Sequence, residues 1–213
     1  MTLHHTDCMA FMAEQPDKSF DLGLIDPPYR DSNNPHRTMK RAGSMASIVG
    51  RPDQAFFDEV NRVCQHWIIW GANNFALAFK GFVVWSKTNI PNNFTMSKAE
   101  IAALSESLAT TSKVYQGTSV DKNRIHPNQK PVALYGWLLK NYAKAGYRIL
   151  DTHLGSGSSA IAAHHNGHFD FVGCEINQKY FNDAKKRIAA ETQQLALTYW
   201  KQLFLGKHDA SDS

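Results

Sequence analysis

The chain has 213 residues, of which 43% are hydrophobic and 20% charged, a balance typical of a folded globular domain rather than a disordered chain. Its formal net charge of +4 is compatible with a nucleic-acid partner but does not require one. No apolar run approaches bilayer-spanning length, and the first residues lack the basic and apolar regions of a signal peptide. Cys8, Cys64 and Cys174 have neither metal-ligand nor redox spacing, so we expect a reduced, cytoplasmic setting.

The amino-terminal stretch, residues 3–12, predicts a short strand followed by the start of a helix. Asp7 stands at the boundary between them, where Asp is a favoured helix N-cap. A turn-forming sequence at residues 16–19 follows. It leads into the apolar run at residues 22–25, which predicts a short buried strand.

That strand delivers the tetrapeptide Asp26-Pro27-Pro28-Tyr29 to its carboxyl end, where ligands bind in open α/β sheets. Pro28 lacks an N–H and holds Pro27 extended, so the main chain is stiff there. An amino group on an aromatic ring could donate to Asp26 and to the Pro27 carbonyl while its ring stacks on Tyr29. This arrangement suits a nucleobase taken out of its stack. The alternative is a strand that ends in an ordinary Pro-rich turn.

The tetrapeptide resembles the catalytic motif of the amino-group DNA methyltransferases, which methylate adenine N6 or cytosine N4. In that family, Asp in the first place is more typical of the adenine enzymes, and Ser is more typical of the cytosine enzymes. The resemblance implies that Asp7 holds the adenine end of the cofactor, S-adenosyl-L-methionine. That role and helix capping do not exclude each other.

Residues 30–52 are polar and rich in Asn, Ser, Arg and Gly, and we predict a long loop that closes as a lid over the target base. Its basic residues adjoin the predicted base pocket, where a phosphate backbone would run. A solvated loop is the alternative. The DNA-binding candidates are Arg30, Arg37, Lys40 and Arg41.

The middle of the chain predicts a helix at residues 53–66 and strands at 67–70 and 81–85. Its patterns Trp-Gly-Ala-Asn-Asn-Phe and Val-Trp-x-Lys resemble the middle of the same family, without an assignable role for each residue. We expect residues 86–125 to be a small target-recognition insertion that contains a short helix at residues 100–104.

Residues 126–135 predict a polar loop followed by a helix that begins at Pro131. A helix start with Lys130 beside it suits a carboxylate. The string resembles the His-Pro-Thr-Gln-Lys-Pro motif of the family, which flanks the methionine part of the cofactor, and Asn128 replaces Thr. The resemblance therefore assigns His126, Asn128 and Lys130 to cofactor binding.

Residues 147–175 predict a strand ending in Asp151, a glycine turn, a helix, and a strand ending in Glu175. Glu175 follows the turn at close to the roughly 20-residue offset at which an acid reaches ribose hydroxyls. The turn also satisfies the dinucleotide fingerprint, so NAD is an alternative. Two features weigh against NAD: no second nucleotide half follows, and Asp151 fits a cationic ammonium. The predicted cofactor residues here are Asp151, Gly155, Ser156, Gly157 and Glu175, with His153 where the family has Phe.

The catalytic strand precedes the glycine turn, which resembles the circularly permuted order of the β-class amino methyltransferases. We expect a single domain over residues 1–213 with a Rossmann-like α/β fold, in which helices cover both faces of one twisted, mostly parallel sheet. A long helix at residues 177–200 ends the fold.

The resemblance implies a DNA adenine-N6 methyltransferase that acts on double-stranded DNA. It requires no metal and allows a homodimer. Cytosine N4, RNA or a protein amide as substrate, and a catalytically inactive nucleic-acid-binding protein, are the alternatives. Host marking, protection within restriction–modification, and regulation are all open as the biological purpose.

Overall fold

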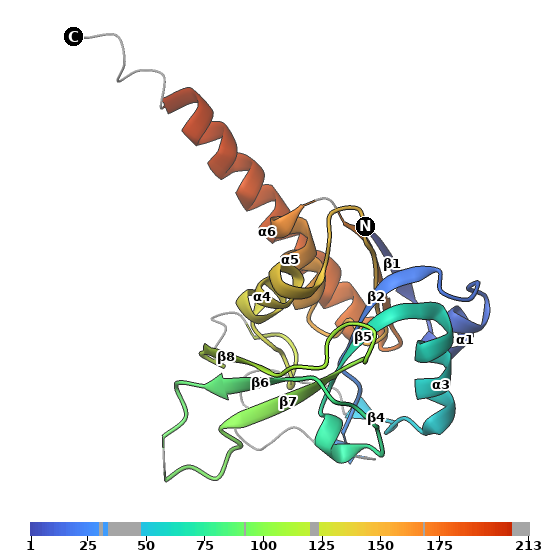
Figure 1. Ribbon diagram of the computed structural model, residues 1–213. Helices are drawn as coiled ribbons and strands as arrows, with labels where there is room; N and C mark the ends of the chain where they lie inside the picture. Colours follow the sequence, from blue (N-terminus) through green and yellow to red (C-terminus); the bar gives the residue numbers. More distant parts are fainter. Residues whose placement is uncertain (30–31, 34–47, 92, 120–123, 168, 206–213) are drawn as a thin grey trace.

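The computed structural model describes residues 1–29, 32–33, 48–91, 93–119, 124–167 and 169–205, and its centre is one eight-stranded sheet (Figure 1). The strand order is β1-β10-β9-β2-β5-β7-β6-β8. Strand β7 runs antiparallel to its neighbours β5 and β6, and the other pairs are parallel. The strands are β1 (Thr2–His5), β2 (Phe20–Ile25), β5 (Cys64–Trp70), β6 (Phe82–Lys87), β7 (Ala99–Leu104), β8 (Lys113–Gly117), β9 (Arg148–Asp151) and β10 (Asp170–Glu175).

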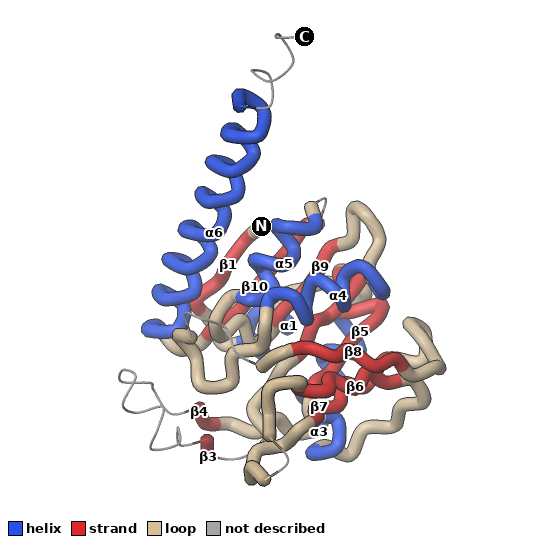
Figure 2. Tube along the Cα trace, turned by 90° about the vertical axis from the view of Figure 1, so that its left-hand side faces the viewer, coloured by secondary structure: helices blue, strands red, loops and turns tan. Residues whose placement is uncertain are grey.

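Helices cover both faces of this sheet (Figure 2). Adjacent residues of a strand point to opposite faces, so Leu24 and Ile25 of β2 enter different cores. One core receives α4 (Val132–Tyr142), α5 (Ser158–Asn166) and α6 (Gln178–Leu205), and the other receives α1 (Cys8–Ala13) and α3 (Gln54–Val63). A short 3-10 helix, η1 (Ala72–Asn74), follows β5. The predicted fold class is confirmed.

One predicted element is wrong: residues 100–104 belong to strand β7 and not to a helix. Alanine and leucine favour helices on propensity alone. Here the stretch is paired on both sides, with β5 and β6, and tertiary pairing overrides that preference. The expected insertion at residues 86–125 thus contains two strands of the central sheet, β7 and β8.

The predicted lid begins and ends in a small antiparallel pair, β3 (Ser32–Asn33) with β4 (Ile48–Val49). The predicted DNA-binding residues Arg30, Arg37, Lys40 and Arg41 lie outside the described residues. Among the helices that the structure describes, none combines the length and apolarity needed to cross a membrane. Figure 1 shows α6 extending beyond the sheet.

Candidate active site

The predicted catalytic and cofactor-binding residues meet at the carboxyl ends of the parallel strands. Strands β1, β10, β9 and β2 are parallel neighbours, so the residues that follow their carboxyl ends come together. They surround a cavity of about 400 Å³. Of the predicted catalytic and cofactor residues, the cavity is lined by Asp7, Asp26, Pro27, Pro28, Tyr29, His126, Asn128, Lys130, Gly155, Ser156 and Glu175.

Asp26 is anchored through one of its two carboxylate oxygens. Its Oδ1 accepts hydrogen bonds from the Tyr29 hydroxyl at 2.9 Å and from Lys130 Nζ at 2.6 Å. Oδ2 has no partner within the described part of the chain, so it is available to a ligand in the cavity. Burial raises the pKa of Asp26, and the positive charge of Lys130 opposes that rise.

The Tyr29 ring depends on Gly71, which follows strand β5. Gly71 has a φ of +70°, and a Cβ there would lie 2.2 Å from Tyr29 Cε1. On another side, Phe75 meets the Tyr29 ring edge-on, with centroids 6.2 Å apart. The Trp-Gly-Ala-Asn-Asn-Phe pattern therefore supplies the support for Tyr29, a role that the sequence alone does not reveal.

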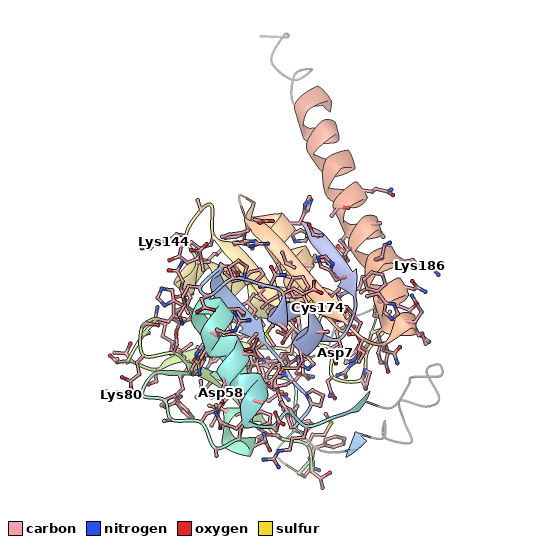
Figure 3. All side chains as sticks on the ribbon, turned by 90° about the vertical axis from the view of Figure 1, so that its right-hand side faces the viewer. Asp7, Asp58, Lys80, Lys144, Cys174 and Lys186 are labelled. Atoms are coloured by element: carbon pink, nitrogen blue, oxygen red, sulfur yellow. The ribbon has the colours of Figure 1, made fainter. Side chains whose placement is uncertain are left out.

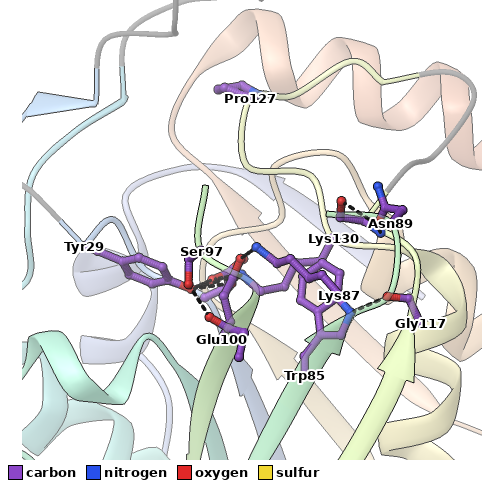
Figure 4. Close-up of polar contacts among 12 residues, drawn as sticks. Tyr29, Trp85, Lys87, Asn89, Ser97, Glu100, Gly117, Pro127 and Lys130 are labelled. Atoms are coloured by element: carbon purple, nitrogen blue, oxygen red, sulfur yellow. Dashed lines mark hydrogen bonds and ion pairs between the residues drawn. The ribbon is translucent and has the colours of Figure 1, made fainter. Parts of the chain in front are cut away.

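Lys130 lines the cavity and contacts the tetrapeptide, whereas sequence analysis placed it at the carboxylate of the cofactor. Besides its bond to Asp26, its Nζ donates to the Tyr29 hydroxyl at 3.0 Å and pairs with Glu100 Oε2 at 3.2 Å (Figure 4). Glu100 also pairs with Lys87 Nζ at 2.5 Å. The long lysine side chain reaches across the cavity edge, which the spacing of the motif does not indicate. Sequence analysis placed Lys87 and Glu100 in the target-recognition insertion at residues 86–125 and not beside the tetrapeptide.

Asp7 and Glu175 occupy the other side of the cavity and bind backbone N–H groups. Asp7, which is labelled in Figure 3, caps α1. Its Oδ1 accepts hydrogen bonds from the amides of Met9 at 2.8 Å and Ala10 at 3.1 Å. This confirms the N-cap prediction and leaves Oδ2 without a partner among the described residues. Glu175 accepts from Gly155 N at 2.9 Å and Asn177 N at 2.8 Å, and burial raises its pKa.

Asp151 lies behind the cavity and does not line it, with only 2% of its surface exposed. It accepts hydrogen bonds from the Ser159 hydroxyl and from His153 N, and both of those residues line the cavity. Burial raises the pKa of Asp151 to about 7. His153 packs edge-on against Phe56 with ring centroids 5.5 Å apart, so it supplies an aromatic contact in the place where the family has Phe.

His126 forms the wall beside the glycine turn. Its ring packs edge-on against Tyr180, with centroids 4.4 Å apart, and its Nδ1 accepts from Asn128 N at 3.3 Å. Burial, with the charges of Arg124 and Lys130, lowers the pKa of His126 to about 3. The neutral imidazole is therefore a packing group and a hydrogen-bond acceptor at physiological pH.

Helix α6 holds the glycine turn in place, a contact that sequence analysis missed. Gly157 has a φ of +75°, and a Cβ there would lie 2.8 Å from Ile188 Cδ1. Arg187 Nη1 donates to the Ser156 carbonyl and to Ser158 Oγ, both at 2.9 Å. Gly157 thus permits helix packing and does not itself line the cavity.

Among the residues that the structure describes, no group of three or more His, Cys, Asp or Glu side chains is arranged to hold a metal ion. The cavity presents two kinds of surface. One is the stiff tetrapeptide with its lysine, and the other is a set of carboxylates around a glycine turn.

Comparisons with known proteins concern the family and the fold. The sequence profile of the N6/N4 methyltransferase family, described as DNA methylase, matches residues 20–186. The type II methyltransferase M2.DpnII of Streptococcus pneumoniae is 25% identical across 91% of this chain and 91% of its own length.

Two solved structures share the fold. The M1.HpyAVI–SAM complex has a TM-score of 0.63 at 18% identity and covers 88% of this chain and 98% of that one. The cytosine-N4-specific PvuII DNA methyltransferase has a TM-score of 0.62 at 10% identity and covers 90% and 91%. Since the family profile matches most of the length of this chain, the chain belongs to the N6/N4 family of DNA methylases.

Proposed function

We propose that this protein transfers a methyl group from S-adenosyl-L-methionine to N6 of an adenine flipped out of double-stranded DNA, with the permuted order of the β class. One observation carries the proposal: the tetrapeptide at the end of β2 and the glycine turn after β9 line the same cavity. A methyl donor and an extruded base could therefore meet there.

The carboxylates of the glycine side fit this cofactor. Asp7, Asp151 and Glu175 accept hydrogen bonds from backbone amides or a hydroxyl, and in the described residues none of them forms an ion pair with Lys or Arg. Their uncompensated charge favours a cation. We assign Asp7 to the adenine end and Glu175 to the ribose. We assign Asp151 to the ammonium, on which its charge would act from behind the cavity wall. His126, Asn128, Gly155 and Ser156 would line the remainder of the cofactor's path.

The sulfonium of the bound cofactor supplies a methyl group that is already activated. The chain's own task is the nucleophile, because the adenine N6 lone pair is delocalised into the ring. Hydrogen bonds from N6 to Asp26 Oδ2 and to the Pro27 carbonyl would favour a tetrahedral nitrogen with an available lone pair. Stacking on Tyr29 would contribute about 1–3 kcal/mol, and positioning for in-line transfer supplies much of the rate.

The choice of adenine over cytosine rests on Asp26, because Asp in this place is more typical of the adenine enzymes. The PvuII enzyme, which shares the fold, is cytosine-N4-specific, so cytosine N4 is the second candidate. For DNA contact we propose the basic residues Arg30, Arg37, Lys40 and Arg41. The end of that stretch supports this, since Gly50 and Pro52 line the cavity.

The test is to incubate unmethylated duplex DNA with the protein and S-adenosylmethionine, then digest the DNA and identify the methylated nucleoside by mass spectrometry. We expect N6-methyladenine. N4-methylcytosine would replace the adenine assignment with the second candidate. A parallel incubation with RNA tests the other substrate class, and the absence of any methylated nucleoside would overturn the proposal.

A further inference from the structure

Four charged side chains of alternating sign form a continuous row beside the cavity, which we call the charge chain: Asp26, Lys130, Glu100 and Lys87. Figure 4 labels the last three of them. The successive N···O distances are 2.6, 3.2 and 2.5 Å. The exposed fractions of the side chains are 4% for Lys130 and 8% for Lys87, and 16% for Asp26 and 22% for Glu100, so the lysines are buried and the acids are partly buried. Strands β6 and β7 supply the two members that are farther from the cavity.

Burying this many charges costs free energy, and a packed apolar cluster of similar volume is often at least as stable. Each ion in the charge chain nevertheless has an opposite neighbour, so no charge is left alone. Lys130 also lies over the rings of Tyr29 and Trp70, at 5.5 and 5.2 Å from their centroids. An arrangement of this kind, which includes the proposed catalytic carboxylate of Asp26, points to a role in the reaction.

Lys130 is fully saturated by this arrangement. An ammonium has three hydrogens, and three acceptors surround it: Asp26 Oδ1, the Tyr29 hydroxyl oxygen and Glu100 Oε2. Glu100 therefore fixes where the ammonium lies, and the ammonium fixes which oxygen of Asp26 is engaged. Lys87 holds the other oxygen of Glu100.

We propose that Glu100 and Lys87 are positioning residues for methyl transfer, acting through Lys130 so that Asp26 offers Oδ2 to the substrate amino group as a carboxylate. This inference rests on the proposed function and adds two residues from strands β6 and β7 to it. It moves Lys87 of the Val-Trp-x-Lys pattern from the predicted target-recognition insertion to the active site.

The charge chain also predicts the direction in which substitutions at Glu100 and Lys87 shift the pKa of Asp26. Asp26 faces Tyr29 from its own turn, Lys130 before α4, Tyr135 of α4, Glu100 of β7 and Asp151 of β9. Although burial opposes ionisation, Lys130 and Lys87 lower the pKa of Glu100 to about 2, so it remains negative at working pH. Loss of the Glu100 charge makes Asp26 easier to ionise, whereas loss of Lys87 leaves Glu100 less compensated and makes Asp26 harder to ionise.

The experiment measures the single-turnover rate of methyl transfer to duplex DNA against pH for Glu100→Gln, Lys87→Met and the double variant. We expect the acid limb of the pH–rate profile to move to lower pH in Glu100→Gln and to higher pH in Lys87→Met, by about 0.5–1 pH unit each. The double variant should fall between the two. Calorimetry with S-adenosylhomocysteine verifies that each variant is folded, and Lys87→Gln replaces Lys87→Met if the latter fails to bind.

The matched controls are Lys80→Met and Glu106→Gln, which break an exposed Lys–Glu pair of 3.1 Å elsewhere on the molecule. Their acid limbs should coincide with that of the wild type. Limbs that do not move in the charge-chain variants, or that move in the same direction, would overturn the inference even if the wild type methylates DNA. No methylation by the wild type would instead overturn the proposed function.

Discussion

The two sides of the cavity hold their acidic residues in opposite ways. On the tetrapeptide side, Asp26 and Glu100 are neutralised by Lys130 and Lys87. On the glycine side, Asp7, Asp151 and Glu175 are held by amides and a hydroxyl instead. The first side is balanced before any ligand arrives, which suits a neutral base. The second carries uncompensated negative charge, which suits a cationic cofactor.

This contrast teaches that hydrogen bonds and ion pairs around a carboxylate have different consequences for the ligand. A backbone N–H fixes the position of an acid without cancelling its charge, whereas a lysine does both. Variants that affect one side should therefore leave the other side's ligand nearly untouched.

The largest effect is expected for Asp26→Ala, which breaks only the tetrapeptide side. We expect the rate of methyl transfer to fall by about 10²–10³-fold, as when an electrostatic contact to a reacting group is removed. The affinity for S-adenosylhomocysteine, measured by calorimetry, should change only a few-fold. Full activity of this variant would reject the catalytic assignment of Asp26.

Gly157→Val is the reciprocal change on the glycine side. A side chain at φ +75° is strained and would press on Ile188 of α6, which displaces the turn. We expect cofactor affinity to fall by about 10²-fold and the thermal midpoint to drop. Gly146→Ala is the control, because φ is +84° there and no atom lies within 4 Å of the added Cβ. Unchanged cofactor affinity in Gly157→Val would contradict the role of α6.

The pH dependence of cofactor binding sharpens the contrast. The pKa of Asp151 is raised to about 7 by burial, and a bound cation favours its ionised form. Below about pH 7 binding must therefore release a proton, and affinity should fall by up to about tenfold per pH unit. His126 and His153, whose pKa values burial lowers to about 3 and about 4, stay neutral in this window.

The measurement for Asp151 is titration calorimetry with S-adenosylmethionine between about pH 5.5 and pH 8, in buffers of different ionisation enthalpy. Asp151→Asn should bind weakly at every pH and show no proton release. A flat affinity profile for the wild type would argue against Asp151 as the ammonium's partner.

The smallest effect is expected for Asp7→Asn, which separates the two roles of that residue. Asn caps helices as well as Asp does, so the unfolding free energy should change by less than about 0.5 kcal/mol. Cofactor affinity should still fall several-fold, because the free oxygen Oδ2 becomes an amide donor. Asp7→Ala should lose both functions, at a further cost of about 1 kcal/mol in stability. Equal cofactor affinity in Asp7→Asn and wild type would leave only the capping role.

Sequence analysis predicted the elements that carry strong local signals. Apolar runs located β2, β5 and β9, and the order of the motifs placed Asp26 and Gly155 at one sheet edge, as the shared cavity confirms. It failed where partners distant in the chain decide the outcome. Strand β7 is helical by propensity and a strand by pairing.

The same limit applies to the charge chain and to Gly71. Glu100 meets Lys87 because β6 and β7 pair antiparallel, and Lys130 reaches Asp26 from 104 positions away. Neither contact follows from spacing along the chain. The support that Gly71 gives to Tyr29 is also set by the pairing of β2 with β5.

Strand β1 pairs with β10, and Thr6 N donates to the Glu175 carbonyl at 3.1 Å. The side of the cavity that holds Asp7 and Glu175 is therefore built from two segments that are far apart in sequence, β1 and β10. Strands β2 and β5–β8 come from one continuous stretch of the chain. Closing such a long loop is entropically unfavourable, so β1 should be among the first strands to detach locally. A cofactor that contacts both Asp7 and Glu175 would stabilise the pairing of β1 with β10. Amide hydrogen exchange in Thr2–His5 should therefore slow more on cofactor binding than exchange in β6 or β8.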